Sequence, residues 1–426
     1  MARRLGGVDT RRMPRPSRRR FPLACCPRAG TCLVAVLALA AAAATWASLG
    51  TASTGTRRLI VRFRGPGGWH DSVLVALPAW YGPHRDPPLP LVVSPHSRGL
   101  TPSRWARRWG DLPGRFGLIV LDPGLHGRVI PRRSWAWPPD IAELARLPEL
   151  VHRRLPWLRY DPHRVYAAGD SMGGQETLML LARQPDLFAA AVAADPVTNL
   201  LRRWYEFPLS GESWREQQAA TREVGGTPRQ ARWLYVRRSP VFFARTIAFA
   251  GVPLELWWNP QDTVVVGEST KQTGFFYRTV ERLDPHAPVV VRLHHHVHGW
   301  VFKFDHDLPA MLRFLLAHRR HGPPPTGFAY TSWLPRAAVW GWRVQALGSE
   351  RLLWTISHVT RRGLVSDSPR TLLVRPPFPL ARATLDGRRD RVTAEGALVP
   401  PGRHRLALVP VALRRLTARP ARRGRG

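Results

Sequence analysis

The chain has 426 residues, 44% of them hydrophobic, which is enough for a substantial core and excludes a disordered protein. Its formal net charge is +35 at pH 7, but lysine occurs only at Lys271 and Lys303 and no nucleic-acid recognition motif accompanies the arginines. Evenly spread arginine beside abundant alanine, proline and glycine is typical of coding bias, so we expect no nucleic-acid partner.

The first 52 residues have the composition of an export segment. Residues 1–31 are basic, and residues 32–52 belong to an apolar segment whose uncharged run, TCLVAVLALAAAAATWASL, has about the length that crosses a hydrocarbon core. This order is typical of an export signal or a signal anchor, so we expect an exported protein, secreted or tethered to the membrane. The motif SRRRFPL at 17–23 resembles the twin-arginine export signal; a generic basic region is the alternative.

The cysteines lie at the same end of the chain. Cys25, Cys26 and Cys32 all fall in or before the apolar segment, and the remainder has none. The exported part is therefore predicted to fold without disulfides. We expect membrane contact only through an N-terminal anchor.

Three successive strand-like runs begin at residue 57, and strands alternate with helices from residue 117 to residue 320. Continuous apolar runs such as GLIVLDP (117–123) and RVYAAG (164–169) are typical of strands buried on both faces, and the helical pattern DIAELARLPELVHRRL separates these two. Further strands are predicted within 188–196, 252–260 and 288–296. The alternation predicts an α/β domain with a mostly parallel sheet covered by helices.

Residues 199–240 interrupt this alternation. The segment is rich in Trp, Arg and Glu and contains no clear strand. Long insertions between sheet strands are usually functional, so we interpret it as a lid over the carboxyl edge of the sheet. Trp204 and Trp214 would then line the substrate pocket. An ordinary helical excursion is the alternative.

A second domain is predicted beyond the linker HGPPPTG. Short alternating runs with DG and PPG turns over 325–415 indicate a small β-sandwich, and residues 416–426 form a basic tail. Trp340, Trp342 and Trp354 could contact polysaccharide if exposed, although aromatic residues at period two more often face a core.

The sequence GDSMG places Ser171 between Gly169 and Gly173. The motif follows an apolar strand and opens a helix. A sharp strand-to-helix turn needs small residues two positions away from the serine on each side, and it exposes the hydroxyl at a helix N-terminus. We therefore predict that Ser171 is a nucleophile. A glycine-rich turn with a capping serine is the alternative.

A catalytic serine needs a histidine base and an acid that orients it, in the chain order serine, acid, histidine for this kind of turn. Asp262 follows a buried strand and a turn, where the acid is expected, and Asp195 at the end of the preceding strand is the second candidate. Among the clustered histidines of RLHHHVHGW, residues 294–296 are assigned to the strand. His298 in the following loop is therefore the predicted base, with His306 in reserve.

The histidine cluster also raises the question of a metal. Imidazoles at such spacing can bind one. No cysteine or HExxH-like partner accompanies them. No metal site is predicted.

Two backbone N–H groups are required for the developing oxyanion. One is predicted from Met172, the residue after the nucleophile, and the other from the loop after an early strand. That loop reads LVVSPHSRGL, so Ser97 or Arg98 supplies the second amide. His96 is expected to shape the loop.

With these residues placed, the region 57–320 resembles an α/β-hydrolase of the group that contains esterases, polyhydroxybutyrate depolymerases and prolyl-oligopeptidase-like enzymes. The specific matches are YDPHRVYAAGDSMGGQETLMLLARQPDLFAAAVA, GVPLELWWNPQDTVV and HGW. The resemblance implies a triad of Ser171, Asp262 and His298, an acyl-enzyme intermediate and no cofactor. The propeller of prolyl oligopeptidase is not expected here, which favours an esterase.

Three functions follow from these observations. The first is an exported serine hydrolase that cleaves small or polymeric carboxylic esters. The second is a serine peptidase of the prolyl-oligopeptidase type, and the third is a catalytically silent protein that binds polymer or cell wall. A complete triad argues against the third, because a binding protein does not need all three side chains.

Overall fold

A computed structural model describes residues 55–411, apart from 66–67, 84–86, 125–133, 211–212, 300–301, 303–306, 321, 349–350, 391 and 394–395. The chain divides into two compact units, residues 1–52 and 53–426, and the described residues belong to the second. The predicted export segment, the three cysteines, His306 and the basic tail lie outside the described residues. None of the described helices has the length and apolar character needed to cross a membrane.

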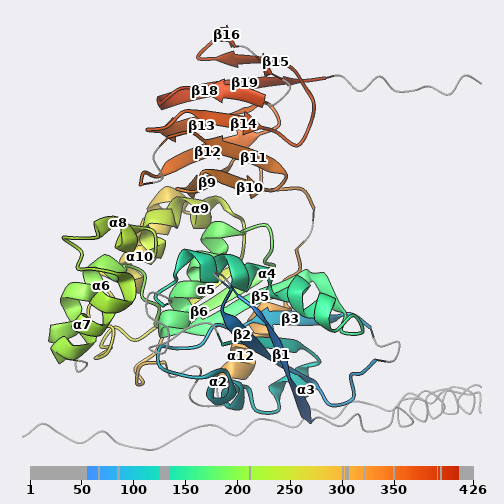
Figure 1. Cartoon of the computed structure of the whole chain (residues 1–426), viewed down its shortest axis with the longest axis vertical. Coiled ribbons are helices and arrows are strands. Elements are labelled where there is room, and N and C mark those ends of the chain that lie inside the picture. Colours follow the sequence, from blue (N-terminus) through green and yellow to red (C-terminus); the bar gives the residue numbers. More distant parts are fainter. Residues whose placement is uncertain are drawn as a thin grey trace, which may run out of the picture. The chain divides into compact units, whose positions relative to one another are not determined.

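An eight-stranded sheet forms the centre of the α/β domain, which lies in the second unit (Figure 1). Its strands are β1 (Thr56–Arg64), β2 (His70–Pro78), β3 (Leu89–Val93), β4 (Ile119–Pro123), β5 (Tyr160–Asp170), β6 (Ala190–Ala194), β7 (Leu254–Trp258) and β8 (Val289–Leu293). They lie in the order β1-β2-β4-β3-β5-β6-β7-β8. All pairs from β4 to β8 are parallel, whereas β2 is antiparallel to both of its neighbours. The carboxyl ends of β5 to β8 therefore meet at one edge.

Both faces of the sheet are buried from β2 to β7, which explains the continuous apolar runs of these strands. Alternate residues of β2 to β7 enter two separate cores, as Ala191 and Val192 of β6 do, whereas β1 and β8 contribute to one of them. One core contains α4 (Pro138–Arg154), α5 (Ser171–Arg183), α9 (Ala244–Phe249) and α10 (Thr273–Leu283). The other contains α2 (Pro102–Trp109), α3 (Leu112–Phe116) and α12 (Leu308–Leu316). The predicted α/β fold class is confirmed.

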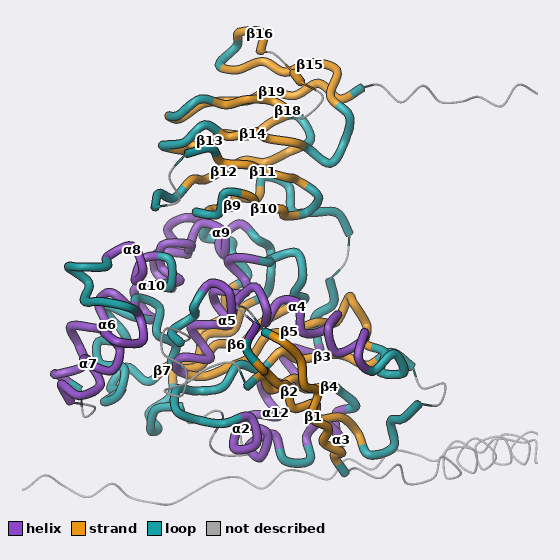
Figure 2. The backbone as a smooth tube through the Cα atoms, in the orientation of Figure 1, coloured by secondary structure: helices purple, strands orange, loops and turns teal. Residues whose placement is uncertain are grey.

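The insertion between β6 and β7 is helical (Figure 2). It contains α6 (Leu200–Glu206), a 3-10 turn at Phe207–Leu209, α7 (Ser213–Val224), α8 (Arg232–Val236) and a second 3-10 turn at Pro240–Phe243. Its apolar side chains form a small core of their own that also includes Met172 and Val265. The insertion thus packs against the segments that follow β5 and β7.

The C-terminal strands form two antiparallel sheets around one core. The five-stranded sheet contains β10 (Arg336–Val339), β11 (Trp342–Ala346), β14 (Leu372–Arg375), β18 (Gly396–Val399) and β17 (Val392–Thr393). The six-stranded sheet contains β16 (Arg388–Asp390), β15 (Leu380–Leu385), β19 (Gly402–Pro410), β13 (Gly363–Ser368), β12 (Trp354–Thr360) and β9 (Phe328–Ser332). Trp342 and Trp354 are 3% and 0% exposed, so these two belong to the core of the domain, and Trp340 is partly buried against the same core.

The C-terminal β-rich region contacts the α/β domain through buried groups. Tyr330 donates a hydrogen bond of 3.1 Å to the carbonyl of Arg183, whose guanidinium lies 4.4 Å from the ring centroid of Trp333. The amide of Thr331 donates to Oγ1 of Thr246 at 2.8 Å. Arg183 is the last residue of α5, so this contact lies at the opposite end of that helix from Ser171.

Candidate active site

Ser171 lies at the junction of β5 and α5. Its φ is +54°, in the left-handed region that a non-glycine residue adopts only at a cost of about 1–2 kcal/mol. The residue is half-buried. As the first residue of α5, Ser171 also lies beside backbone N–H groups that have no acceptor within the helix. This strained turn is the conformation that the GDSMG motif predicts.

The flanking glycines are required by close approach of the backbone. A Cβ atom at Gly169 would lie 2.6 Å from the carbonyl oxygen of Gly173. A Cβ atom at Gly173 would lie 2.1 Å from the carbonyl oxygen of Pro95 and 3.1 Å from the carbonyl carbon of His96. The loop after β3 therefore passes directly against the first turn of α5.

Alanine at Gly173 is expected to displace that loop. We predict a loss of kcat of at least about 10²-fold, because a 1 Å misplacement at a reacting centre has this effect. The free energy of unfolding should fall by about 1–3 kcal/mol, as is typical of overpacking. The matched control is Gly174→Ala, whose Cβ would lie 3.0 Å from its nearest neighbour and should be tolerated better. Equal kinetics and thermal stability in the two variants would contradict this account.

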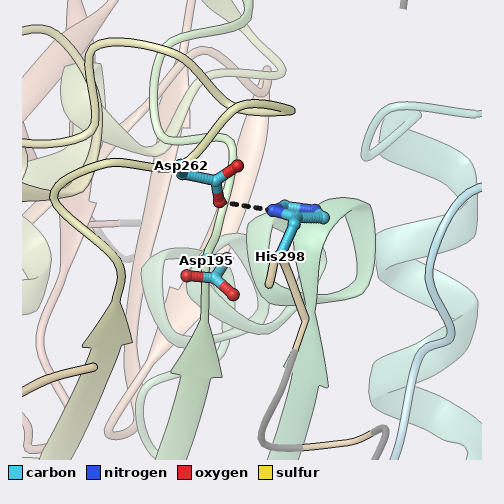
Figure 3. Close-up of side chains that lie close together, drawn as sticks. All are labelled: Asp195, Asp262 and His298. Atoms are coloured by element: carbon cyan, nitrogen blue, oxygen red, sulfur yellow. Dashed lines mark hydrogen bonds and ion pairs between the residues drawn. The ribbon is translucent and has the colours of Figure 1, made fainter. Parts of the chain in front are cut away.

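The structure brings Asp262 and His298 together at the ends of β7 and β8 (Figure 3). The Nδ1 atom of His298 lies 2.6 Å from Oδ2 of Asp262. The other carboxylate oxygen, Oδ1, accepts hydrogen bonds from the amides of Val264 and Val265 at 2.7 and 3.0 Å. These amides fix the carboxylate, and the carboxylate in turn orients the imidazole through Nδ1.

Charge and burial act in opposite directions on this pair. Burial alone would lower the pKa of His298, but the carboxylate of Asp262, with smaller contributions from Asp195 and Asp170, raises that pKa above its ordinary value of 6.5. Burial would also raise the pKa of Asp262, but the hydrogen bond and charge of His298 hold it below 3.8. Asp262 is therefore ionised at neutral pH and stabilises the imidazolium form of His298.

The raised pKa of His298 predicts the acid limb of the pH profile. Only a neutral imidazole can accept a proton from a serine hydroxyl, so kcat/KM should rise with pH through the pKa of the free enzyme's histidine. Since that pKa lies above 6.5, the half-maximal rate is expected above pH 6.5. Measurement of kcat/KM on a neutral ester from about pH 5 to pH 9 tests this. A half-maximal rate at or below pH 6.5 would contradict it.

Asp195, the second candidate for the acid, has a different set of partners. It is fully buried, with φ at +42°. Its Oδ2 accepts a hydrogen bond of 2.6 Å from the amide of Gly299, next to His298. Its Oδ1 lies 3.0 Å from Nε2 of His294 and accepts from the amide of Asn259 at 3.1 Å. Asp195 therefore connects the loop that carries the histidine to the loop that carries Asp262.

This connection also corrects one detail of the sequence analysis. Residues 294–296 were assigned to the strand, but β8 ends at Leu293. The ring of His294 is buried against Asp195, while His295 and His296 are exposed. Sequence spacing contains no signal for this pair, because 99 residues separate its members.

Asp195, Asp262 and His298 are the described residues with the spacing of a metal site. One ligand atom from each lies within 4.8 Å of the others. Both oxygens of Asp195 already accept hydrogen bonds, and Nδ1 of His298 faces Asp262. A cation here would have to displace these contacts, so the donor set fits a hydrogen-bonded network better than a metal centre.

The loop after β3 contacts the turn between β5 and α5 through side chains as well as backbone. Ser97 donates a hydrogen bond from Oγ to Oδ1 of Asp170, the residue before the serine. The Nδ1 atom of His96 lies 2.9 Å from the carbonyl oxygen of Ser97. The hydrogen bond from Ser97 to Asp170 holds this loop near the first turn of α5, where Met172 also lies.

The two tryptophans of the insertion have different environments. Trp204 is half-buried against the core that includes Met172, and its Nε1 donates to Oγ1 of Thr221 at 2.8 Å. Trp214, near the start of α7, is 56% exposed. Their assignment to a substrate pocket stays a prediction.

Comparison with known proteins gives partial matches. The model of the prolyl oligopeptidase family matches residues 157–252, from just before β5 to just before β7. A poly(3-hydroxybutyrate) depolymerase of Ralstonia pickettii is 34% identical over 88 residues, which cover 19% of this chain and 18% of that protein. The match thus spans less than a fifth of the curated relative.

Two solved structures are similar over the larger part of the chain. An acylaminoacyl peptidase of Pyrococcus horikoshii is 17% identical, with 65% of this chain and 42% of that chain covered and a TM-score of 0.47. A ferulic acid esterase is 15% identical, with 61% and 98% covered and a TM-score of 0.47. At this level of similarity neither structure carries an argument about substrate.

Proposed function

We propose that this chain, a serine hydrolase of the esterase and prolyl-oligopeptidase type with an α/β-hydrolase fold, cleaves carboxylic esters through an acyl-enzyme on Ser171. The type of enzyme expected from the sequence is supported by the family model over residues 157–252 and by the depolymerase match. The observation that carries the proposal is the strained Ser171 at the end of β5, together with the 2.6 Å contact between His298 and Asp262 at the same edge of the sheet.

The proposed mechanism assigns one role to each side chain. His298 accepts the proton of Ser171 as the hydroxyl oxygen attacks the acyl carbon, and then gives that proton to the leaving alcohol. Asp262 holds the imidazole in the required tautomer and stabilises its charge. The same histidine then activates water, which releases the acid and restores Ser171.

The charge that develops on the acyl oxygen is held by backbone amides. Met172 would supply one N–H, and Ser97 or Arg98 would supply the other. Support for this role is that the loop with Ser97 and Arg98 is held against the first turn of α5 by the close contact at Gly173 and the Ser97 to Asp170 hydrogen bond, because donors on a fixed loop cost little reorganisation during the reaction.

Ester specificity is supported by the leaving group and by one relative. An alcohol leaves more readily than an amine, and the Ralstonia pickettii relative carries the name of a poly(3-hydroxybutyrate) depolymerase. The prolyl oligopeptidase match favours the second candidate, a serine peptidase. The test is a matched pair, one short acyl ester and the corresponding peptide amide, compared by kcat/KM. Faster ester turnover supports the proposal, and comparable amide turnover would favour the peptidase.

We also propose that the enzyme acts outside the cytoplasm. The support is the basic flank and the apolar run at 31–49. Fractionation of the producing cells checks this: the protein should be found in the medium or the membrane fraction. Recovery among cytoplasmic proteins alone would contradict export.

A further inference from the structure

The side chain of Arg98 is held by the insertion. Its Nη2 lies 2.6 Å from Oε1 of Glu223, its Nε donates to Oε2 of the same carboxylate at 3.2 Å, and its Nη1 pairs with Glu216. The two glutamates are seven residues apart on α7, so they lie on one face of that helix. The side chains of Arg98 and Glu223 are 9% and 8% exposed. A bidentate guanidinium pair of this kind fixes direction as well as distance.

The same carboxylate also holds the segment before α4. Oε2 of Glu223 accepts hydrogen bonds from Oγ of Ser134 at 3.0 Å and from Nε1 of Trp135 at 2.7 Å. The guanidinium of Arg98 lies 5.0 Å from the ring centroid of Trp135, and the amide of Trp135 donates to Sδ of Met172 at 3.4 Å. Glu223 is thus connected to both segments that would supply oxyanion amides, the loop with Arg98 and the turn with Met172.

We propose that Glu223 is a positioning residue for the oxyanion hole, and that the insertion through α7 sets the geometry in which the acyl oxygen is held. This inference rests on the proposed function. Its physical basis is that Arg98 and Ser97 are neighbours in one short loop, so anchoring the Arg98 guanidinium restrains the backbone that carries both amides. The insertion then contributes to the chemical step in addition to any contact with substrate.

A purely structural role for Glu223 predicts a different result. Loss of a buried ion pair destabilises a protein whether or not the pair affects the reaction. If the ion pair of Glu223 only held the insertion in place, substitution of Glu223 would lower thermal stability and leave kcat unchanged in the folded enzyme. A positioning residue must also change transition-state stabilisation relative to substrate binding.

The experiment uses the full chain and Glu223→Gln, a change that keeps the shape of the side chain and removes its charge. We expect kcat on a short ester to fall about 10- to 100-fold with little change in KM, because outright removal of an oxyanion donor costs about 10²–10³. Affinity for a boronic acid that forms a tetrahedral adduct with the serine should weaken by a similar factor. The matched control is Glu149→Gln, which removes an exposed pair with Arg153 on α4.

Three outcomes separate the alternatives. A kcat within twofold of the unsubstituted enzyme, with a lower melting temperature, would overturn the inference while the proposed function stands. Absence of ester turnover in the unsubstituted enzyme would overturn both. If Glu223→Gln does not fold, the second variant is Glu216→Gln, which removes the more exposed of the two glutamates that pair with Arg98. Unchanged kcat and boronic acid affinity in that variant would likewise overturn the inference.

A double substitution strengthens the test. If Arg98 and Glu223 act as a unit, Arg98→Met combined with Glu223→Gln should lower kcat no more than the worse single variant. Additive losses of kcat would show that the two side chains act independently, and the proposal that Glu223 acts through Arg98 would be wrong.

Discussion

Replacing Ser171 with alanine is expected to lower kcat on a carboxylic ester by at least about 10⁴-fold, because loss of the nucleophile in a serine hydrolase removes the whole covalent route. The fold should be retained. Alanine is smaller than serine. The backbone strain at the left-handed φ of +54° is about the same for alanine as for serine. The residual rate would come from the oxyanion amides and substrate binding alone.

The matched control for this variant is Ser103→Ala, on the exposed surface of α2. It should leave kcat and the melting temperature close to those of the unsubstituted enzyme. Turnover by Ser171→Ala within tenfold of the unsubstituted enzyme would show that another residue carries the chemistry.

The second large effect distinguishes the two candidate acids. Asp262→Asn is expected to lower kcat about 10⁴-fold, since an amide in place of the carboxylate favours the wrong tautomer of the histidine. Asp195→Asn should cost about 10- to 100-fold, because Asp195 acts mainly by holding the backbone of Gly299 and Asn259, and its charge contributes less than Asp262 to the raised pKa of His298. Both variants preserve the shape of the side chain, so each controls for the other.

The pH profile adds a readout specific to charge. Removal of the Asp262 carboxylate takes away the largest contribution that raises the pKa of His298, so any residual activity should have its acid limb at lower pH. If Asp195→Asn were the more damaging of the two variants, the assignment of Asp262 as the orienting acid would be wrong.

Sequence reasoning predicted the elements whose signals are local. Ser171 could be located because an apolar strand, two glycines and a helix follow one another within a few residues. The positions of Asp262 and His298 after predicted strands single them out in the sequence, and the structure brings these two together. Their catalytic roles, and that of Ser171, stay predictions until the variants are measured.

Other features depend on contacts between distant residues and carry no local signal. Glu223 forms an ion pair with Arg98, which lies 125 residues away in the sequence, and His294 contacts Asp195, which lies 99 residues away. The tryptophans of the C-terminal domain do have a local signal, the alternation of apolar residues along a strand. That alternation does not tell which face of the strand is covered. Trp354 is fully buried because the second sheet packs on its side of β12.

The most direct test of the account is a chemical one. The enzyme would be mixed with excess p-nitrophenyl acetate, quenched with acid during the first turnovers, digested and analysed by mass spectrometry. The account predicts an acetyl group on the peptide that contains Ser171, formed together with a burst of nitrophenol. Turnover of the ester with no acyl group on Ser171, or with the acyl group on another residue, would contradict it.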